Sequence, residues 1–156
     1  MSTREELERI ELTSHEQYIE LLVKLRKLTR YISIVQIDGE EKDDPIVLKA
    51  KSVMQLHHSR TTDNWFSTYA PRRQAAEYVF VKHKGFFDYL MGFESFFFSH
   101  YNKNGAYEPE YTDFNTCDDI AFFDDEMQLL FYTCTHEGFA WIYPDVLKVD
   151  ISYLKR

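Results

Sequence analysis

Residues 118–143, DDIAFFDDEMQLLFYTCTHEGFAWIY, decide the fold because they predict three short strands that follow one another closely in the chain. Three apolar runs, 120–123, 129–135 and 139–143, are rich in β-branched and aromatic residues. Such runs favour strands over helices at this length. Side chains alternate along a strand, and both faces of these runs are apolar. We therefore expect a three-strand meander that is covered on both sides or lies centrally in its sheet.

Polar and glycine residues mark the connections of this meander. The triplet Asp124-Asp125-Glu126 interrupts the first two runs with three like charges, which suits a solvated turn. Gly138 favours a chain reversal because it adopts a positive φ at little cost. Pro144 ends the third run, since proline has no amide hydrogen to donate to a strand partner.

The remaining periodicity predicts an α+β fold in one domain, 1–156, with a mixed or antiparallel sheet packed by two or three helices. The sequence Ser14-His15-Glu16-Gln17 has the spacing of a capping box and precedes an apolar stripe at helical spacing. The expected elements are a helix over 14–30, a strand over 31–38, a helix from Pro45 (or a strand over 46–50), an irregular segment over 57–73, a strand over 78–83, a helix over 86–101, a loop over 102–116 and an edge strand over 147–154. Residues 1–13 are either frayed or carry a short strand at 10–12.

The net charge of −8 comes from one part of the chain. Residues 1–103 hold 15 Lys or Arg and 15 Asp or Glu, whereas residues 104–147 hold ten acids and no Lys or Arg. Such a field repels nucleic acid and attracts basic proteins. Solubility alone also explains any single acidic turn. We expect no nucleic-acid partner.

Composition and motifs argue against several other classes. No run of eighteen apolar residues and no leader pattern occur, so we expect no membrane span, a cytoplasmic location and reduced thiols at Cys117 and Cys134. The five glycines are too scattered for a phosphate-binding loop. The acids lack the spacing of a calcium loop, and H-E-x-x-H is absent. We expect no cofactor and no metal.

A few side chains remain as candidates for acid–base chemistry. His57 and His58 precede Arg60 and could supply a general base, although surface polarity explains them equally simply and is favoured. Cys134 lies two residues before His136, but no known thiol-enzyme pattern surrounds it, and a small buried side chain is the preferred interpretation.

Several short motifs resemble an uncharacterised family of small bacterial proteins. They are Tyr78–His83, an aromatic-rich segment, D-I-x-F-F-D at 119–124 and T-x-T-H-E at 133–137. The resemblance covers about 78–143 and implies a bacterial, cytoplasmic α+β domain without supplying a catalytic assignment. His136 and Glu137 in the T-H-E segment are either a functional pair or a turn that fixes the strand exit, and the turn is favoured.

Three functional hypotheses follow. The first is an acidic protein-binding module, for example an immunity-type inhibitor of a basic toxin or nuclease, because acids and aromatics alternate near the meander. Its candidate binding residues are Trp65, Tyr107, Tyr111, Asp113, Phe114, Asp118, Asp119, Asp124, Asp125 and Glu126. The second is a small hydrolase or ligand-binding enzyme with His136 and Glu137 as acid and base, in a pocket between the aromatic helix and the sheet. The third is a structural homodimer.

Overall fold

The computed structural model describes residues 7–37, 45–62, 64–65, 68–69, 75–96, 100–101, 104–108, 117–134 and 139–149. Its elements are β1 (Glu8–Ile10), α1 (His15–Leu28), β2 (Tyr31–Ile37), α2 (Pro45–Val53), β3 (Gln55–Thr62), β4 (Asn64–Trp65), β5 (Thr68–Tyr69), β6 (Ala75–Val81), α3 (Lys84–Leu90), β7 (His100–Tyr101), β8 (Tyr107–Glu108), β9 (Cys117–Phe123), β10 (Leu129–Cys134), β11 (Phe139–Ile142) and the 3-10 turn η3 (Pro144–Val146).

Seven strands form one antiparallel sheet in the order β1-β11-β10-β9-β2-β6-β3. The predicted meander is confirmed as β9, β10 and β11, and β11 ends directly before the Tyr143-Pro144 pair. β4 pairs with β5, and β7 pairs with β8, in two small separate ladders. The fold is thus the predicted α+β class with an antiparallel sheet.

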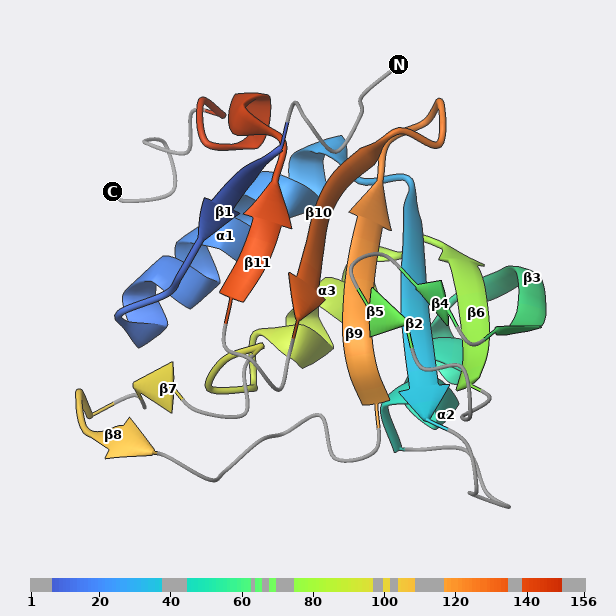
Figure 1. Ribbon diagram of the computed structural model, residues 1–156, viewed down its shortest axis with the longest axis horizontal. Helices are drawn as coiled ribbons and strands as arrows, with labels where there is room; N and C mark the ends of the chain where they lie inside the picture. The colour runs from blue at the N-terminus through green and yellow to red at the C-terminus, as the bar shows by residue number, and fades with distance from the viewer. Residues whose placement is uncertain are drawn as a thin grey trace.

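The three helices cover one face of this sheet (Figure 1). Their apolar stripes join a single core with inward-facing residues of the strands. At its centre the ring of Phe96 lies 4.8 Å from Tyr18, 5.3 Å from Phe131 and 6.2 Å from Phe122, measured between centroids. Aromatic contacts of this kind contribute beyond the area they bury. The aromatic core therefore holds α1 and the segment after α3 against the meander.

The opposite face of the sheet is also buried in its central part. Ala121 and Tyr132 form a second, smaller cluster with Leu7, and Val35 and Val79 are buried on neighbouring strands. This confirms the expectation that both faces of the meander are removed from water. Buried polar residues, among them Ser33 and Glu77, are interspersed on this second face.

The first helix begins where its capping sequence predicts. Ser14 is the N-cap, and its hydroxyl accepts a hydrogen bond from the Gln17 amide at 3.2 Å. The Gln17 side chain turns back to accept from the Thr13 amide at 2.8 Å, one residue earlier than in the standard capping box. The helix ends at Leu28, so it is slightly shorter than predicted.

Two predicted elements in the middle of the chain are wrong in extent or type. Residues 57–62 are not an irregular segment but belong to β3, a strand at the sheet edge whose exposed, polar side chains carry no strand-like alternation. The helix expected over 86–101 ends at Leu90, because the chain turns at Met91-Gly92 and delivers Phe93 and Phe96 to the core without helical geometry.

The sheet edge beside β11 is also occupied differently from the prediction. Residues 144–149 form η3 and a following turn, so the part of the expected strand over 147–154 that is described is not a strand, and 150–154 lie outside the described residues. β1 takes this edge, pairing Glu8 with Ile142 and Ile10 with Ala140. In the part of the chain that is described, no helix is long and apolar enough to cross a bilayer.

Candidate functional site

The β9–β10 turn presents the acidic triplet in a fixed backbone conformation. One carboxylate oxygen of Asp124 accepts hydrogen bonds from the amides of Glu126 and Gln128, both at 2.9 Å. The Asp124 amide in turn donates to the Gln128 carbonyl at 3.0 Å. Asp124 is therefore a structural residue of the turn, whereas Asp125 and Glu126 are exposed and, among the described residues, form no ion pair.

Met127 follows these acids in an unfavourable conformation. Its φ of 61° lies in the left-handed region, where a side chain other than that of Gly or Asn costs about 1–2 kcal/mol. The side chain is 41% exposed and so is not retained by core packing. The turn thus presents two exposed carboxylates and a flexible apolar side chain in adjacent positions.

A cleft of about 500 Å³ lies beside this turn at the end of α1. Asp124 and Asp125 line it together with Asp145 of η3, so folding brings acids from two separate segments to one place. Lys27 and Arg30 line the opposite part of the same cleft. The cleft therefore has mixed charge, and the exposed acids of the turn form its negative rim.

The structure does not bring all the predicted binding residues together. The prediction that Asp119 belongs to the binding surface is wrong. Asp119 is 1% exposed within β9, because the Asp118-Asp119 pair lies inside the strand and not before it. Tyr107 is 56% exposed, and its ring lies 5.3 Å from that of Tyr101 between centroids, tilted by 59°. In Figure 1 β7 and β8 lie at the lower left, towards the end of the sheet away from the acidic turn.

Other candidates cannot be placed as side chains. Only the backbone of Trp65 and Asp118 is described, in β4 and β9. Tyr111, Asp113, Phe114, His136 and Glu137 lie outside the described residues. A pocket was expected between the aromatic helix and the sheet. Besides the cleft beside the turn, a cleft of about 320 Å³ lies between β1 and α1. Neither of these two clefts is lined by a residue of 86–101.

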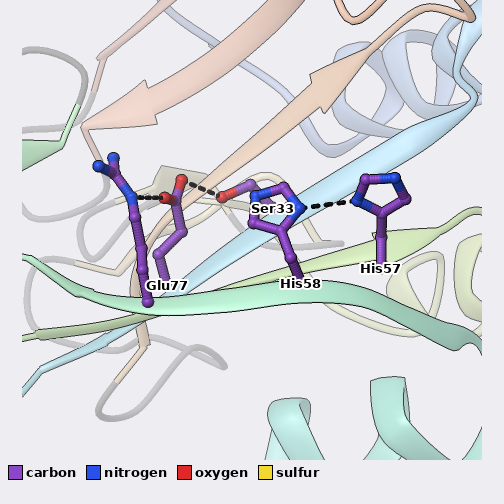
Figure 2. A network of polar contacts seen from close by, with 5 residues as sticks. Ser33, His57, His58 and Glu77 are labelled. Atoms are coloured by element: carbon purple, nitrogen blue, oxygen red, sulfur yellow. Dashed lines mark hydrogen bonds and ion pairs between the residues drawn. The ribbon is translucent and has the colours of Figure 1, made fainter.

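The sequence analysis did not predict a row of polar side chains on the second face of the sheet. Glu77 of β6 is buried, with its side chain 8% exposed. Its carboxylate accepts from Arg60 Nε of β3 at 2.6 Å and from the buried Ser33 hydroxyl of β2 at 2.8 Å. Figure 2 shows Glu77, Ser33, His58 and His57 following one another along this face. Both carboxylate oxygens of Glu77 are thus engaged, which compensates for removing its charge from water.

The two histidines at the end of this row are in direct contact. His57 Nδ1 and His58 Nδ1 are 2.7 Å apart, so one ring donates its Nδ1 proton to the other. The His57 ring also meets the Tyr31 ring edge-on at 5.1 Å. The sequence showed the two residues side by side, but a regular strand would have placed them on opposite faces.

Lys82, which follows β6 and lies beside the end of α1, has a lowered pKa. Burial lowers the pKa of Lys82 from its ordinary value of 10.5, and the positive charges of Arg26 and Arg30 lower it further. Lys82 Nζ nevertheless donates to the Arg26 carbonyl at 2.9 Å, which satisfies an otherwise unpaired carbonyl at the helix end. Among the described residues, no group of three or more His, Cys, Asp or Glu is arranged to hold a metal ion.

Comparison of the chain with protein-family models, with curated proteins and with solved structures found no match.

Replacing Glu77 with Ala is expected to destabilise the protein by about 2 kcal/mol, because the Ser33 hydroxyl loses its acceptor inside the sheet. Arg60→Ala is also expected to destabilise the protein, because the Glu77 side chain is only 8% exposed and its buried charge loses the cationic partner. Urea denaturation of both variants and of the Ser33→Ala/Glu77→Ala cycle measures these terms. A Glu77→Ala variant as stable as the natural chain would contradict the assignment.

Lys82 makes the stability depend on pH in a defined direction. Its pKa is lower in the folded than in the unfolded chain, so between the two values the unfolded chain binds more protons. The free energy of unfolding attributable to Lys82 therefore rises with pH towards 10.5 and is constant below the folded pKa. Denaturation of the natural chain and of Lys82→Gln at a series of pH values isolates this contribution as their difference. A difference that falls with rising pH would refute it.

Proposed function

We propose that this protein binds a basic protein, and that it acts as an immunity-type inhibitor of a basic toxin or nuclease. The observation that carries the proposal is the β9–β10 turn, where Asp125, Glu126 and Met127 are exposed on a backbone fixed by Asp124. A preorganised loop loses little entropy on binding, which favours recognition of another macromolecule.

The conformation of Met127 adds a second argument. The left-handed backbone at this position closes the turn, in which the Met127 amide donates to the Asp124 carbonyl at 3.1 Å, but Gly or Asn would adopt it at lower cost. Methionine is flexible and polarisable and suits contact surfaces. Retention of a strained, exposed methionine between acids is therefore better explained by contact with a partner than by folding.

The charge distribution supports a basic partner in particular. The ten acids within residues 104–147 produce the whole net charge of the chain, and Asp125 and Glu126 are unpaired among the described residues. Asp145 extends the negative rim from the turn to η3, where it pairs with Lys148 at 3.3 Å, although both side chains are well exposed. Complementary charge accelerates encounter by steering the partner.

The partner is sought by capture on the immobilised full chain from the native cytoplasm, and binding kinetics are then measured with the purified partner. Asp125→Asn/Glu126→Gln is expected to lower the association rate constant by about tenfold at low salt, with a smaller effect at high salt where charges are screened. Glu8→Gln/Asp88→Asn is the matched control, because it removes two exposed acids elsewhere on the molecule. An equal effect of both double variants, or capture of acidic partners alone, would overturn the proposal.

Met127→Asn separates recognition from folding. Asn tolerates the left-handed conformation, so this variant is expected to be as stable as the natural chain or more stable by up to about 1 kcal/mol. Its affinity for the captured partner should fall, because the apolar contact is lost. Leu56→Thr on β3 removes a side chain of similar exposure, 43% against 41%, and serves as the control. Unchanged affinity in Met127→Asn would remove Met127 from the interface.

A further inference from the structure

The irregular start of β3 orients two neighbouring imidazoles to the same side. The register pairs Leu56 with Phe80 and His58 with Val79, so His57 is one extra residue on the β3 side of the ladder. A bulge of this kind interrupts the alternation of side chains. His57 and His58 consequently lie together on the second face of the sheet, where both rings are exposed to solvent.

The separation of the two Nδ1 atoms fits a particular coordination geometry. Imidazole nitrogens lie about 2.0–2.1 Å from a bound first-row divalent metal. Two such nitrogens are then about 2.9 Å apart when they subtend a right angle, and about 3.3 Å apart at the tetrahedral angle. The observed distance is 2.7 Å, so a right-angle arrangement requires the two nitrogens to separate by about 0.2 Å and both rings to turn until their Nδ1 lone pairs converge on the metal.

We propose that His57 and His58 chelate a first-row transition metal through their Nδ1 atoms, with Cu²⁺ preferred. Square-planar and tetragonal sites with right angles are typical of Cu²⁺ and Ni²⁺, whereas Zn²⁺ favours tetrahedral ligands. The order of intrinsic affinities also places Cu²⁺ first among these ions. Binding replaces the hydrogen bond between the rings, and both rings then carry their proton on Nε2.

The surroundings of the pair restrict it but leave coordination positions open. Tyr31 packs edge-on against the His57 ring and limits its rotation. Glu77 lies on the same face, but Arg60 and Ser33 already occupy its two oxygens. Within the described residues no third ligand of the His, Cys, Asp or Glu type joins the pair. The remaining positions are therefore open to water or to a group from another molecule.

The test is titration of the full chain, without a histidine tag, with Cu²⁺, Ni²⁺ and Zn²⁺, read by electron paramagnetic resonance for Cu²⁺ and by competition with a chromophoric chelator for all three. One equivalent of Cu²⁺ bound by two imidazole nitrogens is expected, with affinities in the order Cu²⁺, Ni²⁺, Zn²⁺. His57→Asn and His58→Asn should each weaken Cu²⁺ binding by at least about tenfold.

His83→Asn is the matched control. His83 caps α3 by accepting from the Gly85 amide at 3.0 Å, and Asn is a good N-cap, so this variant should keep both the fold and the copper site. Circular dichroism of every variant checks that the exposed substitutions on β3 preserve the fold. Copper binding that is absent at one equivalent, or equal in the natural chain and both β3 variants, would overturn the proposal, as would tighter binding of Zn²⁺ than of Cu²⁺.

Discussion

The packing of Phe96 against Tyr18, Phe122 and Phe131 is the contact on which the rest of the structure depends. It joins α1 and the chain after α3 to two strands of the meander. Phe87 of α3 adds a further contact with Phe122, at 5.6 Å between centroids. Since the meander is fixed to the helices at this point, the β9–β10 turn is held beside the end of α1, where the mixed-charge cleft forms.

Irregularities in the strand register determine what each face presents. A shift between Leu129 and Phe131 lets Leu130 and Phe131 both join the core beneath the helices. The shift between Leu56 and His58 lies on the edge strand β3, and it places two exposed histidines together on the other face of the sheet. Bulges are often found where a side chain is redirected for function. The shift in β10 thus serves packing, whereas the shift in β3 brings together the two histidines.

The sequence predicted the parts of the fold in which local signals agree with tertiary packing. The meander combines apolar runs with acidic, glycine and proline boundaries, and α1 combines a cap with an amphipathic stripe, so each was recognisable. β3 was not, because a strand at the edge with one neighbour needs no alternating pattern. The helix was predicted to continue beyond Leu90 because the apolar residues of this segment have helical spacing, namely Phe86, Leu90, Phe93, Phe97 and Tyr101. Turns and not a helix carry Phe93 and Phe96 to the core.

The row of polar side chains on the second face could not be predicted from the sequence, for a different reason. Ser33, Arg60 and Glu77 come from three strands, and their meeting depends on the register of two ladders that local patterns do not specify. Asp119 shows the same limitation, since only the pairing of β9 reveals that this acid is inside the sheet and not on its surface.

The acidic turn and the histidine pair lie at the same end of the sheet but act as separate sites. Cross-strand partners Phe123, Tyr31, Val81 and Gln55 form one row from β9 to β3. With about 4.8 Å between neighbouring strands, Phe123 and Gln55 are about 14 Å apart, and the two sites are farther apart than this because they extend from the row in opposite directions. This exceeds the screening length of about 8 Å at physiological salt, so a metal bound by the histidines changes the field at Asp125 and Glu126 only weakly. A protein interface of standard size covers about 800 Å² on each partner, a radius of about 16 Å. Only a shared partner, and not direct electrostatics, would therefore couple the two sites.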